Sequence, residues 1–254
     1  MGHALVTGAS SGLGALFARE LAKQGRPLVL VARRADRLEA LAAELEQAHG
    51  VRASAIPADL TAPGAIETLV GRLRSDGVEV ETLINNAGFG LRGALTEQPK
   101  ARLLEMVDLN IRALVDLTCE LTPAMKRAGR GGVLNVASTA AFQPGPYMAV
   151  YYASKAFVLS FSEALHEELR KDGVHVTCLC PGATETEFGA VSSMQDTPLF
   201  RLMAQPEPVV QAALRGLARN QAVVVPGLAN AALAASVRLT PRGAARRIAG
   251  RLQR

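Results

Sequence analysis

The chain has 254 residues, 49% of them apolar, which is enough for a large buried core and excludes a disordered protein. Its formal charge of +5 arises near the carboxyl end, where the last 17 residues contain six arginines and no acid. The remainder has 22 basic and 23 acidic residues, so a nucleic-acid partner is not expected. Three cysteines and no signal-like opening segment predict a reducing, cytoplasmic location.

Short apolar or β-branched runs alternate with helical patterns along the chain. The stretches 14–25 and 36–50 repeat apolar residues at helical spacing. Seven runs are expected to be strands: 3–8, 27–33, 51–59, 81–88, 132–138, 174–182 and 222–227. This alternation predicts an α/β fold, a parallel sheet with helices on both faces, in one domain over 1–227 with a tail over 228–254. Ligands of such sheets bind at the carboxyl ends of strands, so residues that follow strands are the site candidates.

A glycine-rich segment, TGASSGLG at 7–14, follows the first expected strand and opens the first helix. Gly8 allows a tight turn, Gly12 lets a pyrophosphate approach the backbone, and Gly14 packs the helix on the strand. The helix N-terminus offers N–H groups to an anion. The segment therefore predicts a dinucleotide site, although a plain strand-to-helix turn has the same glycines.

The end of the second strand bears on the choice of nucleotide. A carboxylate there binds the ribose 2′-OH of NAD, whereas an arginine pairs with the 2′-phosphate of NADP. Ala32 occupies the acidic position and is followed by Arg33 and Arg34. NADP is favoured over NAD. The alternative is that these arginines only start a solvated helix, and the position before Gly12 is Ser11 and not a basic residue.

All three tyrosines lie within six positions, at Tyr147, Tyr151 and Tyr152. Lys155 follows Tyr151 by four residues in a helical pattern, so the two side chains share one helix face. A nearby cation lowers the pKa of a phenol, which makes an activated acid/base pair. Without other motifs such a pair is more often an amphipathic surface pair. Tyr147 precedes the helix in a turn and is expected to line a substrate pocket, and Tyr152 is expected to pack or form an interface.

Several motifs occur together in a known order: TGxxxGxG at 7–14, NNAG at 85–88, NVAS at 135–138, YxxxK at 151–155 and CPGATET at 180–186. From residue 3 to about 227 the chain resembles the short-chain dehydrogenase/reductase family. The resemblance implies a single Rossmann-like, doubly wound domain with strand order 3-2-1-4-5-6-7. It also implies an NAD(P)-dependent enzyme, commonly a homodimer or homotetramer, that needs no metal.

The resemblance implies four catalytic residues. Tyr151 is expected to be the general acid in reduction and the general base in oxidation. Lys155 would lower the pKa of Tyr151 and hold the nicotinamide ribose. Ser138 would position the carbonyl, and Asn110 would extend a proton relay to the lysine. The YxxxK spacing favours carbonyl and alcohol chemistry over reduction of a carbon–carbon double bond.

The resemblance also implies a cofactor-binding set along the chain. Asp59 and Leu60 would contact adenine, and Pro181 and Gly182 would flank the nicotinamide, whose carboxamide Thr186 would bind. The full set expected is Gly8, Ser10, Ser11, Gly12, Leu13, Gly14, Arg33, Arg34, Asp59, Leu60, Asn86, Ala87, Gly88, Tyr151, Lys155, Pro181, Gly182 and Thr186.

Substrate choice is expected from segments 88–97, 139–148 and 188–208, of which about 188–206 would form a lid. These segments are apolar and suggest an apolar ketone, aldehyde or secondary alcohol.

In the tail, a helix with Thr240 as N-cap would place five apolar residues (Ala244, Ala245, Ile248, Ala249 and Leu252) opposite its arginines. That helix is expected to touch a membrane surface weakly, to pack on the protein or an oligomer partner, or to be disordered. A nucleotide-binding regulator or membrane-surface scaffold is the alternative to an oxidoreductase.

Overall fold

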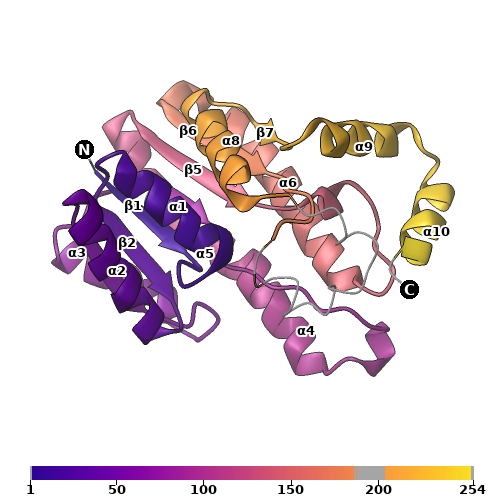
Figure 1. The fold of residues 1–254 in the computed structure, drawn as a ribbon, viewed down its shortest axis with the longest axis horizontal. Coiled ribbons are helices and arrows are strands. Elements are labelled where there is room, and N and C mark those ends of the chain that lie inside the picture. Colours follow the sequence, from indigo (N-terminus) through magenta and orange to yellow (C-terminus); the bar gives the residue numbers. More distant parts are fainter. Residues whose placement is uncertain (1, 186, 188–203, 253–254) are drawn as a thin grey trace.

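The computed structural model describes residues 2–185, 187 and 204–252. Seven parallel strands form one sheet in the order β3-β2-β1-β4-β5-β6-β7, which confirms the predicted fold (Figure 1). The strands are β1 (His3–Thr7), β2 (Leu28–Ala32), β3 (Ala53–Pro57), β4 (Val80–Asn85), β5 (Gly131–Val136), β6 (Val174–Leu179) and β7 (Val223–Val224). The helices are α1 (Gly12–Lys23), α2 (Ala35–His49), α3 (Ala65–Ser75), α4 (Lys100–Val107), α5 (Ala113–Ala128), α6 (Ala149–Leu169), α8 (Pro206–Ala218), α9 (Leu228–Leu239) and α10 (Arg242–Leu252).

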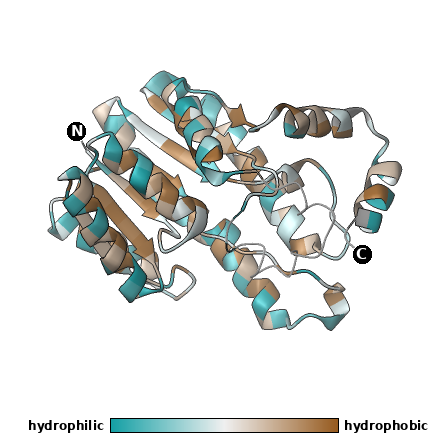
Figure 2. Ribbon diagram, viewed as in Figure 1, coloured by the Kyte–Doolittle hydropathy of each residue, from teal (hydrophilic) through white to brown (hydrophobic). Residues whose placement is uncertain are grey.

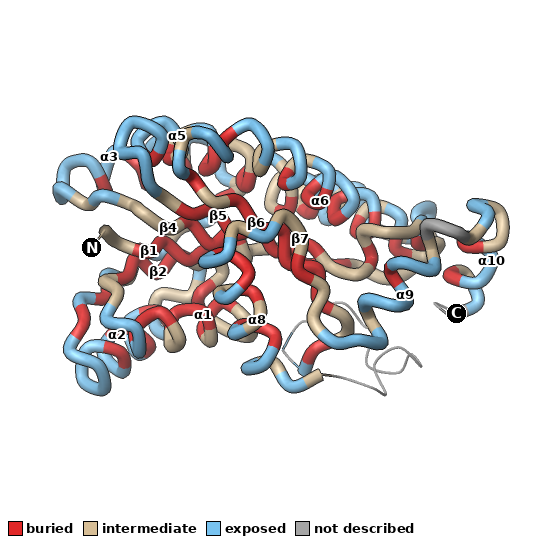
Figure 3. Tube along the Cα trace, turned by 90° about the horizontal axis from the view of Figure 1, so that it is seen from above, coloured by how far each residue is buried: buried red, intermediate tan, exposed pale blue. Residues whose placement is uncertain are grey.

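Helices cover both faces of the sheet, and this explains why the central strands are continuously apolar. Alternate residues of β1 face opposite ways: Ala4 and Val6 join the core beneath α1, α2 and α8, whereas Leu5 joins the core beneath α3 and α5. Figure 2 shows the strands as hydrophobic ribbons between helices with hydrophilic sides. Figure 3 shows the buried strands between the two helix layers. Side-chain alternation along each strand therefore builds both cores.

The winding of the sheet reverses at β1, which pairs with β2 on one side and β4 on the other. The segment after β1 and the segment after β4 meet at this reversal. The Thr7 hydroxyl accepts hydrogen bonds from the Asn86 and Ala87 backbone N–H groups, each at 3.0 Å. The Asn86 amide donates to the Thr7 carbonyl at 2.9 Å. The glycine-rich segment is thereby held against β4 at the edge where ligands of this fold bind.

The tail forms two helices, α9 and α10, where one helix starting at Thr240 was expected. Thr240 has an extended backbone, and its hydroxyl donates to the Ser236 carbonyl at 2.8 Å. Thr240 is thus the C-cap of α9. The first hydrogen bonds of α10 run from the Ala244 and Ala245 N–H groups to the Pro241 carbonyl, so α10 begins at Arg242, one residue later than expected, and Thr240 is not its N-cap. Ala245 and Ala249 of α10 are buried. A methyl group built on Gly250 would lie 3.3 Å from the Pro146 ring, so α10 packs against the loop that precedes α6.

Candidate active site

A cleft of about 450 Å³ lies along the carboxyl ends of the strands. It runs from the glycine-rich segment past the start of α6 to α9. Most of the expected residues line it: Gly8, Ser10, Ser11, Gly12, Leu13, Arg33, Arg34, Asp59, Leu60, Asn86, Ala87, Gly88, Ser138, Tyr151, Lys155, Pro181 and Gly182. Gly14 and Asn110 lie behind the lining. Thr186 and positions 188–203 of the expected lid lie outside the described residues.

The glycines form a cradle that side chains would fill. Gly8 has a φ of +66°, in the left-handed region that favours glycine. A Cβ built on Gly14 would lie 2.2 Å from the Gly8 carbonyl oxygen, which leaves no room for a side chain. Ser11 precedes α1 in an extended conformation and makes no side-chain hydrogen bond to the helix start. The tight turn and the helix N-terminus fit the pyrophosphate of a dinucleotide.

The arginines after β2 gather beside this cradle. The Arg34 guanidinium donates to the Ser11 hydroxyl at 2.8 Å and to the Ser10 hydroxyl at 3.1 Å. It also forms an ion pair with Glu187 at 3.2 Å, and Glu187 pairs with Arg37 at 2.7 Å. Arg33 lies 3.4 Å from Glu105. Cationic donors therefore face the cleft where an NAD-selective site would have a carboxylate.

Asp59 lies across this end of the cleft, after β3. The Thr61 hydroxyl donates to its carboxylate at 2.7 Å and the Thr61 N–H at 3.0 Å. These hydrogen bonds, with a smaller contribution from the charge of Arg33, lower the pKa of the Asp59 carboxyl group. Glu187 and Arg37 were not among the expected residues, because their contacts join segments about 150 positions apart and no local pattern marks them.

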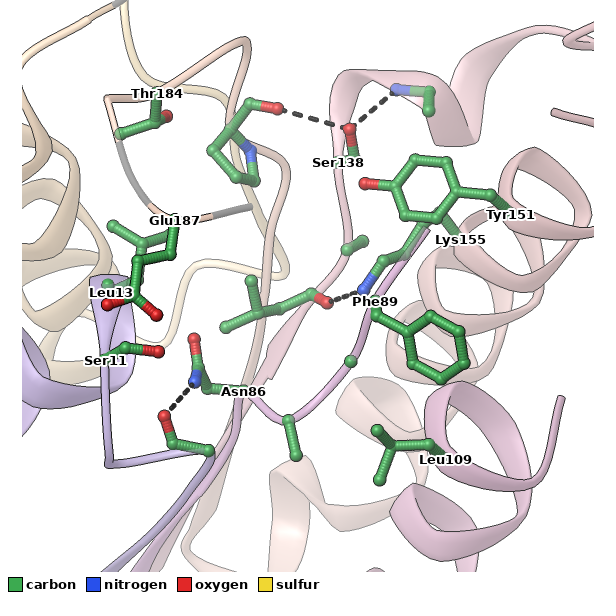
Figure 4. A pocket seen from close by; sticks show the side chains of 18 of the residues that line it. Ser11, Leu13, Asn86, Phe89, Leu109, Ser138, Tyr151, Lys155, Thr184 and Glu187 are labelled. Carbon is green, nitrogen blue, oxygen red and sulfur yellow. Dashed lines mark hydrogen bonds between the residues drawn. The ribbon is translucent and has the colours of Figure 1, made fainter. Parts of the chain in front are cut away.

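Tyr151, Ser138 and Lys155 meet at the centre of the cleft (Figure 4). A hydrogen bond links Tyr151 and Ser138. The Ser138 hydroxyl accepts from the Ala140 N–H at 3.1 Å, and it lies 3.5 Å from the Pro181 carbonyl. The Lys155 ammonium donates to the Val136 carbonyl at 2.8 Å and lies 5.8 Å from the centre of the Tyr151 ring. The serine after β5 and one face of α6 thus converge as the sequence predicts.

Burial controls the ionisation of both α6 residues. It raises the pKa of the Tyr151 phenol, and the Ser138 hydrogen bond opposes it only in part. This direction is opposite to the expected one, because burial is the largest cause and the Lys155 ammonium, which donates to the Val136 carbonyl, is not among the causes of the shift. Burial also lowers the pKa of Lys155 to about 8. Tyr151 is therefore protonated at neutral pH and can donate a proton.

Asn110 lies in a π-helical turn, Asp108–Arg112, between α4 and α5. Such turns are rare and occur mostly at functional sites. The buried Asn110 amide exchanges two hydrogen bonds with the backbone of Phe89, at 3.1 and 3.0 Å. It also donates to the Ser154 hydroxyl at 3.1 Å, which donates to the Tyr151 carbonyl at 2.7 Å. Asn110 thereby ties the segment after β4 to the helix that carries Tyr151.

The other two tyrosines have different surroundings. Tyr147 has a φ of +66°, and its carbonyl accepts the Gly93 N–H at 2.8 Å. Tyr147 does not line the cleft, so the geometry does not bring it to the expected substrate position. Tyr152 is buried, packs edge-on against Tyr151 with ring centres 6.0 Å apart, and lines the cleft. The i+1 neighbour, not the residue in the turn, reaches the site.

The far end of the cleft is formed partly by α9, which sequence reasoning assigned to the tail. Leu233, Ala234 and Val237 line it, together with Phe142 and Gln143 from the loop after β5. These α9 positions are small or aliphatic residues, and no motif distinguishes them from core residues.

Among the described residues, no cluster of three potential metal ligands occurs. No helix within the described ranges is long and apolar enough to cross a membrane.

Comparisons with known proteins agree with this arrangement. The family model for short chain dehydrogenase matches residues 2–196. Serine 3-dehydrogenase from Agrobacterium fabrum is 41% identical over 192 residues, covering 75% of each chain. A short-chain dehydrogenase from Sphingobium yanoikuyae, solved in complex with NADPH, has a TM-score of 0.85 and 36% identity, covering 96% of this chain and 95% of that one.

A second solved structure is similar along nearly the whole chain. The bulky-bulky ketone specific alcohol dehydrogenase from Comamonas testosteroni has a TM-score of 0.82 and 34% identity, covering 96% of this chain and 93% of that one. The likeness thus extends beyond the region that the family model matches. Together with the cradle and the Ser138, Tyr151 and Lys155 arrangement, these matches show that the chain belongs to the short-chain dehydrogenase/reductase family and is an NAD(P)-dependent oxidoreductase acting on carbonyl and alcohol groups.

Proposed function

We propose that this chain is an NADP(H)-dependent oxidoreductase that interconverts a ketone or aldehyde with its alcohol, using Tyr151 as the general acid and base. The observation that carries the proposal is the hydrogen-bonded pair of Tyr151 and Ser138 in a cleft with cationic donors at its other end. The alternative of a nucleotide-binding regulator or scaffold gives no reason to bury a protonated phenol beside a lysine.

The residues divide the work of carbonyl reduction. The nicotinamide of a bound cofactor supplies the hydride. Ser138 donates a hydrogen bond to the carbonyl oxygen and orients it toward Tyr151. The protonated Tyr151 hydroxyl donates its proton to the oxygen as negative charge develops there, and takes it back during oxidation. Lys155 would hold the nicotinamide ribose. Asn110, through its bonds to Phe89 and Ser154, would fix the segments on either side of the lysine.

Several contacts support a preference for NADP(H). Arg34 and the hydroxyl groups of Ser10 and Ser11 form one cluster of donors, with Arg33 nearby. A phosphate accepts charge-assisted hydrogen bonds from such a cluster, whereas a ribose hydroxyl gains less from it. The relative from Sphingobium yanoikuyae was solved with NADPH. Within the cleft, the glycine cradle would receive the pyrophosphate.

The test is NADPH oxidation against a panel of ketones and aldehydes, with the wild-type chain and Tyr151→Phe. Loss of the general acid should lower kcat/KM by about 10²–10⁴-fold with NADPH affinity retained. Tyr152→Phe removes the hydroxyl of the adjacent ring and should cost much less. Equal rates for wild type and Tyr151→Phe would remove the assignment of Tyr151. A chain that binds NADPH yet reduces nothing in the panel would favour the regulator.

A homodimer or homotetramer in the cytoplasm, with weak tail contact to membranes, stays a prediction. In the structure, less of α10 is available for a membrane contact than the sequence suggests. Ala245 and Ala249 are buried against the body of the protein, so two of the five residues on the expected apolar side of α10 are already covered. Ile248 stays 54% exposed beside the outward Arg246 and Arg247. Packing of the tail helix on the protein itself was one of the alternatives that the sequence left open, and the buried alanines of α10 support it.

A further inference from the structure

The helix α9 forms one wall of the cleft at the end away from the nucleotide cradle. Leu233, Ala234 and Val237 recur at i, i+1 and i+4, so they share one side of the helix. Ala234 is 7% exposed, whereas Leu233 is 50% exposed because it borders the open cleft. Leu228, on the same helix, is 92% exposed and does not line the cleft. One side of α9 therefore belongs to the site, and the rest does not.

Both ends of this wall are anchored to the body of the protein. At its start, the Asn230 amide donates to the Pro226 carbonyl at 2.9 Å. The same amide lies against Gly182 of the Pro-Gly motif, where a Cβ would come within 2.6 Å of it. At its end, Thr240 leads into α10, which packs on the loop at Pro146. The anchors set the distance between α9 and the catalytic residues, so the wall has a defined position.

Charge is distributed unevenly along the cleft. The charged side chains that line it among the described residues are Arg33, Arg34, Asp59, Glu105 and Glu187, all around the nucleotide end, and Lys155 at the centre. Helix α9 contacts the turn Thr139–Phe142, and the described lining on this side includes Thr139, Ala140, Phe142 and Gln143 besides Leu233, Ala234 and Val237, none of which is charged. A carboxylate or sulfonate on this side would lose water without gaining a cation from these residues. An apolar group would bury its surface favourably.

We propose that Leu233, Ala234 and Val237 determine substrate specificity and select carbonyl compounds with a bulky, uncharged, apolar substituent. The inference rests on the proposed function, since it places the reacting carbonyl between Ser138 and Tyr151 and the substituent against α9. Specificity then follows from how much apolar surface α9 covers. Substrates that carry a carboxylate or sulfonate at the end of that substituent are disfavoured, because no described side chain in this part of the cleft pairs with them.

The experiment compares kcat/KM for methyl ketones from butanone to octan-2-one and for 7-oxooctanoate, a methyl ketone of the same chain length whose carboxylate lies at the far end of the chain. Wild type should prefer octan-2-one over butanone, and over the acid, by about tenfold or more. Ala234→Phe fills the wall with a ring and should lower kcat/KM for octan-2-one by about tenfold, with less loss for butanone. Leu233→Ala should reduce the preference for length. Leu228→Ala is the matched control and should change neither ratio. NADPH affinity should stay unchanged in all three variants.

Two outcomes would overturn the inference while leaving the proposed function intact: equal kcat/KM for short and long ketones in wild type, or equal effects of Ala234→Phe and Leu228→Ala. If no ketone is reduced, the proposed function fails. The binding of an unreactive ligand then tests separately whether α9 binds apolar groups. Calorimetry with an unreactive apolar amide, N-hexylacetamide, should then show binding that Ala234→Phe weakens and Leu228→Ala does not. Binding that is absent, or equally strong in both variants, would reject the inference that α9 binds the apolar substituent.

Discussion

The two ends of the cleft are built by different means. At the nucleotide end, the backbone itself is the binding surface: Gly8 adopts a left-handed conformation, and Gly14 touches its carbonyl closely. Charged donors from Arg34 complete it. At the α9 end, the surface consists of ordinary aliphatic side chains, Leu233 and Val237 among them. The nucleotide end depends on a backbone conformation and a close contact that glycine allows. The α9 end depends on aliphatic side chains, which several residue types could replace.

This difference determines what a substitution does. A backbone surface cannot move away from an added methyl group without changing the turn, so the nucleotide end should tolerate almost no change at its glycines. An aliphatic wall can be repacked with side chains of other sizes, which changes the shape of the cavity and leaves the fold in place. We therefore expect substitutions at the nucleotide end to abolish binding and those at α9 to redirect specificity.

The largest effect is expected from Gly14→Ala. The new methyl group would meet the Gly8 carbonyl at 2.2 Å, so the helix and the turn must separate. The free energy of unfolding should fall by about 3 kcal/mol, and NADPH binding should be lost. Urea unfolding and a fluorescence titration with NADPH measure the two effects.

Gly71→Ala in α3 is the matched control, because a Cβ at that position meets nothing within 4 Å. It should raise the free energy of unfolding by up to about 1 kcal/mol, since alanine favours the helix. If Gly14→Ala kept its stability and its NADPH affinity, the nucleotide end would be as adaptable as the α9 wall, and the contrast between the two ends would disappear.

A smaller effect is expected from Arg34→Ala, which leaves the backbone cradle in place and removes the charged donors. NADPH affinity should fall about tenfold, a modest loss because the guanidinium is partly exposed, and NADH affinity should fall less. Arg37→Ala is the control, since Arg37 shares Glu187 with Arg34 but does not line the cleft. Equal losses of NADPH and NADH affinity in Arg34→Ala would show that the arginine supports the loop and does not read the 2′-phosphate.

The same contrast explains what could be predicted from the sequence. All seven strands were predictable, because buried parallel strands read as apolar runs, and their order was implied by the resemblance to the short-chain dehydrogenase/reductase family. That Tyr151 and Lys155 share one helix face followed from their spacing, and the family resemblance implied that Ser138 joins them. Helix α9 was placed in the tail, because Leu233 and Ala234 look like any core residues. Tyr147 was expected in the pocket but is not among the described residues that line the cleft, and no sequence pattern marks the positive φ that a tyrosine rarely adopts.

Lys155 lies where the two ends of the cleft meet, and its burial has a measurable consequence for stability. Its pKa is about 8 in the folded chain and about 10.4 in an unfolded one. Between these values the unfolded chain binds more protons, so this lysine makes the free energy of unfolding increase as pH rises. Lys155→Met removes that contribution. The difference in unfolding free energy, wild type minus variant, should therefore increase by about 1.5 kcal/mol between pH 8 and 9.5.

Taking the difference removes opposing contributions that both proteins share. Burial raises the pKa of Tyr151, and a hydrogen bond with Cys178 together with burial raises the pKa of Cys180. Both groups keep their protons in the folded chain after unfolded ones have lost them, so each lowers stability as pH rises. Because Lys155→Met retains both, urea unfolding of the two proteins at several pH values isolates the lysine. A difference that stays constant from pH 8 to 9.5 would mean that the Lys155 ammonium is solvated in the folded chain. Water would then reach the centre of the cleft.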